Sequence, residues 1–191
     1  ASQRRIVLEL TEVLAGIVER VTYHNDENGF CVLRVKARGQ RDLVTVVGHS
    51  ATISAGEWIT ATGEWFNDRT HGLQFKARFL KTTPPTTAEG IEKYLSSGMI
   101  RGIGPVYAKK MVKAFGEQVF DIIEANPERL REVDGIGVVR AQRIVSAWAE
   151  QKAVREIMVF LHSHGVGTAR AVRIYKTYGA DAIHVMTDNP Y

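Results

Sequence analysis

The chain has 191 residues, of which 45% are hydrophobic, and this content suffices for packed cores in one or two domains. Its formal net charge is only +4, with 11 basic and 9 acidic residues up to Thr83 and 14 and 12 after it, so attraction to nucleic acid must come from the placement of basic residues. The single Cys31 excludes a disulfide framework, and no apolar run is long enough for a membrane span or a signal peptide, which together predict a soluble cytoplasmic protein.

The first half of the chain is predicted to form short antiparallel strands. Its apolar segments are rich in β-branched and aromatic residues, and turn-forming residues separate them. In the last segment apolar and polar residues alternate, so the face of Leu73, Phe75, Ala77 and Phe79 is expected to be buried. The expected strands cover residues 13–23, 30–37, 43–49, 57–66 and 73–80.

Five strands within about 70 residues fit a small β-barrel of the oligonucleotide-binding (OB) type, and an SH3-like barrel is the competing fold. The usual ligand face of an OB barrel comprises strands 2 and 3 and the loops between strands 1–2 and 4–5, here residues 24–29 and 67–72. The alternative is that the aromatic residues fill the core and that Asp26 and Glu27 repel phosphates. Candidates for base stacking are Tyr23, Phe30, Trp65 and Phe66, and candidates for phosphate contact are Lys36, Arg38, Arg69, Lys76 and Arg78.

The second half, from Ala88 to Met186, is predicted to contain no strand. The prolines in residues 81–87 mark a boundary between a barrel domain, residues 1–83, and a helical domain, residues 84–191. Thr86 and Glu89 are spaced as in a capping box and place a helix start near Thr87. The amphipathic segments that follow are expected to form a bundle of short helices joined by tight glycine turns.

Three copies of one phrase divide the helical half. Each copy reads Gly, an aliphatic residue, Gly, three variable residues and Ala, with a basic residue two positions later. The first, second and third copies occupy residues 101–112, 133–144 and 164–175. The shared positions are Gly102, Ile103, Gly104, Ala108 and Lys110; Gly135, Ile136, Gly137, Ala141 and Arg143; and Gly165, Val166, Gly167, Ala171 and Arg173.

This pattern predicts a tight turn between two helices. The first glycine ends a helix with a positive φ, the aliphatic residue points inward, and the small alanine permits close helix packing. The second glycine allows close backbone approach at the start of the next helix, where free N–H groups and the helix dipole favour an anion. A dinucleotide-binding fingerprint is rejected, because its sixth position is Tyr107, Arg140 or Arg170 here and the preceding segments are helical.

The spacing resembles the helix-hairpin-helix, a module that grips nucleic-acid backbone phosphate through hairpin amides without reading sequence. With the barrel, it implies an α+β multidomain chain in which an all-α tandem helix-hairpin-helix bundle follows an OB-type barrel. The alternative for any one copy is a purely packing role. Candidate DNA-binding residues are Gly102, Gly104, Lys109, Lys110, Gly135, Gly137, Arg140, Arg143, Gly165, Gly167, Arg170 and Arg173.

A longer repeat relates residues 115–128 to residues 178–191, at the same offset of 63 residues that separates Gly102 from Gly165. The first unit leads to the hairpin at Gly135, whereas the second reaches the end of the sequence. We therefore expect an N-terminal piece of a larger protein, truncated in mid-repeat, with at least a fourth hairpin beyond it.

The whole pattern resembles the N-terminal region of the bacterial stand-alone RecD-like ATP-dependent DNA helicases. The matching phrases include GIVERVTYHNDENGFCVLRVK, GEWITATGEWFNDRTHGLQFKA, YLSSGMIRGIGPVYAKKMV and FLHSHGVGTARAVRIYKTYG. The resemblance implies a parent enzyme that unwinds DNA 5′ to 3′ with ATP and Mg²⁺, in repair or recombination. Its implied partners are single-stranded or tailed duplex DNA, the C-terminal motor and another DNA-repair protein. No Gly-Lys dipeptide occurs, so the motor's phosphate-binding loop is absent, and no catalytic residue, metal or cofactor is expected in this piece.

Two other classes remain open. A RuvA-like DNA-junction-binding protein has the same order of barrel and tandem hairpins, but it does not explain the interrupted repeat. In a protein-interaction module, the barrel would dock on a partner and the hairpins would be scaffold. Salt dependence separates these classes, because backbone binding weakens steeply with ionic strength and apolar docking does not.

Overall fold

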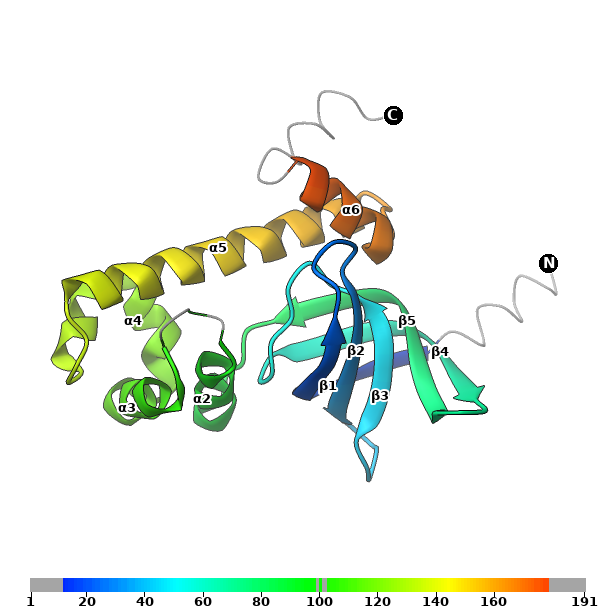
Figure 1. The fold of residues 1–191 in the computed structure, drawn as a ribbon, viewed down its shortest axis with the longest axis horizontal. Coiled ribbons are helices and arrows are strands. Elements are labelled where there is room, and N and C mark those ends of the chain that lie inside the picture. Colours follow the sequence, from blue (N-terminus) through cyan, green and yellow to red (C-terminus); the bar gives the residue numbers. More distant parts are fainter. Residues whose placement is uncertain (1–11, 99, 101–102, 179–191) are drawn as a thin grey trace.

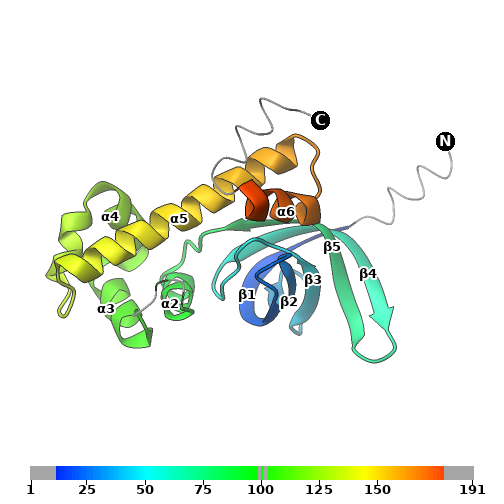
Figure 2. The same ribbon diagram turned by 45° about the horizontal axis from the view of Figure 1, so that its top comes forward.

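The computed structural model of the chain describes residues 12–98, 100 and 103–178. A β-barrel and a group of helices lie beside each other, and one long helix, α5 (Val138–Ser163), runs along both (Figures 1 and 2). None of the helices in the described ranges is both long and apolar enough to span a membrane.

The barrel is closed and has the strand order β1-β2-β3-β5-β4. Neighbouring strands are antiparallel except for the parallel pair of β3 and β5. This is the five-stranded Greek-key barrel of the OB type, as predicted. Its strands are β1 (Glu12–His24), β2 (Phe30–Ala37), β3 (Val44–His49), β4 (Trp58–Asp68) and β5 (Gly72–Thr83).

The predicted buried face of the last strand is only partly right. Phe75 is fully buried in the barrel core, but Leu73 is 59% exposed near the tip of the β4–β5 hairpin. The register shifts beside Thr62, so that Leu80, and not Phe79, continues the buried row. Phe79 instead packs edge-on against the ring of His162, with 4.5 Å between ring centroids. The irregularity therefore turns an apolar side chain of the barrel towards the helices.

No strand occurs in the described part of the helical half. Helix α2 begins at Ala88, and its N-cap is Thr87, whose hydroxyl accepts a hydrogen bond from the N–H of Gly90 at 3.1 Å. The capping box predicted from Thr86 is therefore wrong by one residue. The helices are α2 (Ala88–Ser96), α3 (Pro105–Phe115), α4 (Val119–Ala125), α5 (Val138–Ser163) and α6 (Thr168–Tyr178), with 3₁₀ turns η1 (Gly116–Gln118) and η2 (Pro127–Glu132).

The expected bundle of short helices is wrong for α5, which continues for 26 residues. No glycine or proline interrupts it, so the backbone can extend through both predicted amphipathic segments. Its two halves bury different side chains: Ala141, Ile144 and Trp148 in the first half, and Val154, Ile157 and Leu161 in the second. A single buried stripe on a helix would place the next buried side chain three or four residues after Trp148, but the next one is Val154. At this step the helix changes its packing partner from the helical core to the barrel and α6.

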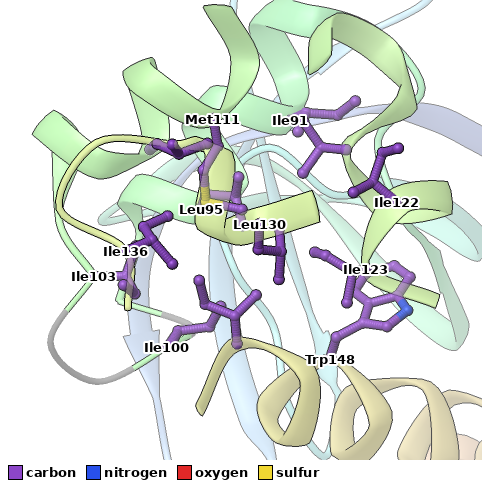
Figure 3. Packing of buried hydrophobic residues seen from close by; sticks show 14 of the residues in the cluster. Ile91, Leu95, Ile100, Ile103, Met111, Ile122, Ile123, Leu130, Ile136 and Trp148 are labelled. Carbon is purple, nitrogen blue, oxygen red and sulfur yellow. The ribbon is translucent and has the colours of Figure 1, made fainter. Parts of the chain in front are cut away.

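Two main cores result. One fills the barrel, and the other lies among α2, α3, α4, η2 and the first half of α5, where Leu130 and Ile144 are fully buried. Figure 3 shows Leu95, Leu130 and Trp148 in this second core. A smaller cluster of Ala51, Val154 and Val172 joins the barrel to α5 and α6.

A buried ion pair also holds the helices to the barrel. Arg155 of α5 donates through Nη2 to Glu57 at 2.7 Å and to the Tyr94 hydroxyl of α2 at 2.8 Å. The Glu57 side chain is only 2% exposed, and burial raises the pKa of its carboxyl while Arg155 opposes that rise. The loop before β4, helix α2 and helix α5 therefore meet at one charge-assisted contact.

Candidate nucleic-acid interface

The hairpin turns have the predicted backbone geometry wherever the structure describes them. Gly135 and Gly165 have φ values of 87° and 79°, in the region that favours glycine. Gly102, the corresponding residue of the first copy, lies outside the described residues, as do residues 179–191 of the longer repeat. The intervening aliphatic residues Ile103, Ile136 and Val166 are buried at 4%, 4% and 9% exposure. They pin each turn to the core beneath it.

The helices before the turns end differently. In the third copy, the N–H of Gly165 donates to the carbonyl of His162 and that of Val166 to Leu161, the two bonds of a Schellman motif. In the second copy the preceding element is the 3₁₀ turn η2, not an α-helix, and the Ile136 N–H donates to the carbonyl of Val133. The hairpin pattern therefore specifies the turn and the second helix more closely than the first helix.

The second glycine of each copy stands directly before a helix. Gly104 and Gly137 are the N-caps of α3 and α5, with φ values of −112° and −96° that any residue can adopt. A Cβ on Gly104, Gly137 or Gly167 would meet no described atom within 4 Å. Neither backbone conformation nor packing in the described residues therefore requires glycine there. What a side chain would obstruct is approach from outside the chain.

These helix starts also suit an anion. Gly104 and Gly137 provide no side-chain cap, and the first turns of α3, α5 and α6 contain no acidic residue. The first N–H groups of a helix have no partner within the helix, and the helix dipole adds positive potential there. A phosphate oxygen can therefore accept hydrogen bonds from this backbone.

The basic candidates differ in how freely they are presented. Lys109, Arg143, Arg170 and Arg173 are exposed on the second helices of the hairpins. Arg140 is half-buried: it donates to the carbonyl of Gly135 at 2.9 Å, and its guanidinium lies 4.2 Å from the centroid of the Tyr107 ring.

Besides the shared core, Tyr107 joins the first two hairpins at their surface. A Cβ on Gly135 would come within 2.8 Å of the Tyr107 ring, so the second turn lies directly on a side chain of α3. Lys110 also approaches this ring, with its Nζ 5.5 Å from the centroid. Lys110 of the first copy and Arg140 of the second therefore both lie beside the Tyr107 ring, so the two hairpins place positive charge near the same residue.

The third hairpin is docked on the barrel. The Thr168 hydroxyl, at the start of α6, accepts a hydrogen bond from the Leu80 N–H of β5 at 3.1 Å. Val172 is fully buried, and a Cβ on Gly29 would lie 2.6 Å from its Cγ1. The repeat alone does not reveal this difference, although Thr168 stands where the other copies have Pro105 and Val138.

The barrel candidates separate into core and surface. Trp65 belongs with the core: it packs edge-on against Phe75 at 5.3 Å, and its indole N–H donates to Glu12 at 2.8 Å. Tyr23 and Phe66 are 50% and 44% exposed. Phe30 is half-buried, and Lys36, Arg38, Arg69, Lys76 and Arg78 are exposed. The Nζ of Lys76 lies 3.8 Å from the centroid of the Phe66 ring.

Three family models match the chain in succession. Residues 11–85 match "ATP-dependent DNA helicase YrrC, OB-fold domain", residues 93–150 match "SAM-like Helix-hairpin-helix tandem", and residues 150–191 match "ATP-dependent RecD2 DNA helicase HHH domain". Together with the fold, these matches define a class: an OB barrel followed by helix-hairpin-helix units.

Among curated proteins, the chain is similar to the ATP-dependent RecD2 DNA helicase of Deinococcus radiodurans, with 28% identity over 176 residues. The aligned part is 89% of this chain and 24% of the relative, so the chain spans about a quarter of that protein's length. In this order, the matches make the chain similar to the N-terminal region of the RecD-like helicases.

Proposed function

We propose that the chain is a non-catalytic DNA-binding region of a bacterial ATP-dependent 5′–3′ DNA helicase that acts in repair or recombination in the cytoplasm. Its hairpins hold the DNA backbone near the motor without reading sequence. The observation that carries this proposal is the set of second glycines, Gly104, Gly137 and Gly167, whose Cβ positions are open and whose backbone leads directly into a helix.

The contacts expected at such a turn are electrostatic. Amide N–H groups at the helix start take one phosphate, and Lys109 or Arg143 on the exposed side of the same helix takes a neighbouring one. Backbone contacts of this kind carry no base information, so affinity should depend little on sequence and strongly on salt. ATP and Mg²⁺ belong to the proposed motor, because the 191 residues contain no Gly-Lys dipeptide.

The test is fluorescence anisotropy with two tailed duplexes of equal length and unrelated sequence. We expect similar affinities for both, and Arg143→Ala should weaken both by a similar factor. Lys113→Ala is the matched control, because Lys113 is exposed in the last turn of α3, at the opposite end from the hairpin turn. A sequence-selective loss on Arg143→Ala, or no binding of either duplex at low salt, would contradict the proposal.

A further inference from the structure

Three aromatic rings form a row across the outside of the barrel. Tyr23 of β1 and Phe30 of β2 have their ring centroids 6.1 Å apart, and Phe30 and His49 of β3 have theirs 5.7 Å apart. Phe30 and His49 are directly paired in the sheet. Their chain neighbours Cys31 and Gly48 are buried, so alternation along each strand turns Phe30 and His49 outward.

Helix α6 of the third hairpin lies at the end of this row. Figure 1 shows it against the loop between β1 and β2, where Val172 is buried against Ala51 and approaches Gly29. The next residue, Arg173, is exposed. Burial, together with the nearby charge of Arg173, lowers the pKa of His49. Neutral His49 therefore offers a ring for stacking, and Arg173 supplies the positive charge beside it.

The same outer face carries further cations. Arg34 of β2 is held by a hydrogen bond from its Nη1 to the Thr45 hydroxyl at 2.6 Å. Lys36 is exposed two residues further along β2, and Lys76 of β5 pairs in register with Val47 of β3. Two acidic residues add negative charge near these cations. Glu64 is paired in register with Lys76, and the carboxylate of Asp26, in the loop between β1 and β2, lies 3.2 Å from His24.

We propose that Tyr23, Phe30 and His49 of the barrel and Arg173 of the third hairpin form one composite site for single-stranded DNA. Bases stack on the rings, and Arg173 contacts a phosphate of the same strand. The ring separations exceed the roughly 3.4 Å rise between bases of a regular strand, so the site suits splayed, unstacked bases. A duplex cannot occupy it in this way, because its bases are paired and stacked. The inference rests on the proposed function only in taking DNA as the ligand.

The test compares an oligothymidylate with a blunt duplex of equal length, both by fluorescence anisotropy at low salt. We expect Tyr23→Ala and Arg173→Gln each to weaken oligothymidylate binding by about tenfold, and Tyr23→Ala to leave duplex binding within about twofold. Tyr23→Phe should retain binding, because it keeps the stacking ring. Tyr178→Ala is the matched aromatic control, since Tyr178 is 47% exposed and Tyr23 is 50% exposed. Lys113→Gln is the charge control.

The outcomes separate the two proposals. Oligothymidylate binding that is absent in the wild type, or unchanged by Tyr23→Ala, would overturn the composite site. Equal loss of oligothymidylate and duplex binding on Tyr23→Ala would also overturn it, because the site would then not be specific for single strands. If the wild type binds oligothymidylate in a Tyr23-dependent way but fails to bind the duplex, the composite site stands and the backbone-gripping role of the hairpins fails.

Discussion

Gly135 and Gly137 stand two residues apart in one turn and are glycines for different reasons. Gly135 has a φ of 87°, and its α-carbon faces the Tyr107 ring, so the chain's own structure requires it. Gly137 has an ordinary φ and open space beside it, so a glycine at this position in the motif is better explained by an external ligand that approaches the backbone. The first kind of glycine stabilises the hairpin, and the second keeps its helix start accessible.

This contrast gives a prediction. Gly135→Ala should lower the free energy of unfolding by more than about 1 kcal/mol, because a Cβ is strained at positive φ and meets the Tyr107 ring. Gly137→Ala should cost less than about 1 kcal/mol, as expected of an alanine N-cap, yet weaken DNA binding. Denaturant unfolding and anisotropy on both variants measure the two effects. Equal destabilisation by both, with unchanged DNA binding by Gly137→Ala, would show that both glycines are structural.

Among the secondary-structure elements, the sequence predicted the individual strands and hairpin turns better than the contacts by which they pack together. Alternating apolar residues and turn signals located all five strands, and the glycine motif located the turns at Gly135 and Gly165, which the structure describes in full. The displaced Phe79 was not predictable, because it depends on a register shift between β4 and β5. The continuity of α5 was hidden because its buried face changes partner between Trp148 and Val154. The third hairpin contacts the barrel partly through the Thr168 hydroxyl, and the repeated motif itself gives no sign of this contact.

The attachment of α5 to the barrel can be tested at Arg155. Arg155→Met removes the charge that compensates Glu57, which is 2% exposed, and should destabilise the protein by about 3–5 kcal/mol. Adding Glu57→Gln should recover part of that loss, because no charge then remains buried. Denaturant unfolding of both single variants and the double variant gives the coupling. Strictly additive losses would mean that the pair contributes nothing as a pair.

The same pair predicts a pH dependence. Burial raises the pKa of Glu57, and loss of Arg155 removes the main opposing interaction. A carboxyl whose pKa is higher in the folded than in the unfolded state binds its proton more readily when folded, so folding is favoured as the pH falls. Arg155→Met should therefore lose less stability relative to the wild type at about pH 5 than at about pH 7. Thermal unfolding at both pH values checks this, and the trend should vanish when the effect of Arg155→Met is measured in the Glu57→Gln background.

At the scale of the whole molecule, the barrel and the third hairpin form one unit, and the first two hairpins share a separate core at the other end of α5 (Figure 1). This division is consistent with two kinds of contact with one DNA substrate: backbone at the far hairpins, and single-stranded bases beside the barrel. The reactivity of Cys31 tests the closure of the barrel independently of any DNA contact.

Cys31 is fully buried in the barrel core, and burial raises the pKa of its thiol to about 12. A thiol reagent should therefore modify the native protein only as fast as the barrel opens, since the thiolate is the reactive form. Spectrophotometric labelling should be slow in buffer and rapid in denaturant. Full modification during mixing in buffer would contradict the closed barrel.

The most direct measurement is the salt dependence of binding to a tailed duplex. For the wild type we predict that log K falls linearly with log salt concentration, with a slope that corresponds to about two to four phosphate contacts. Arg143→Ala should reduce the magnitude of this slope by about 1, and Lys113→Ala should leave it unchanged. A wild-type slope near zero, or one that Arg143→Ala does not alter, would contradict the proposal that the hairpins grip the DNA backbone.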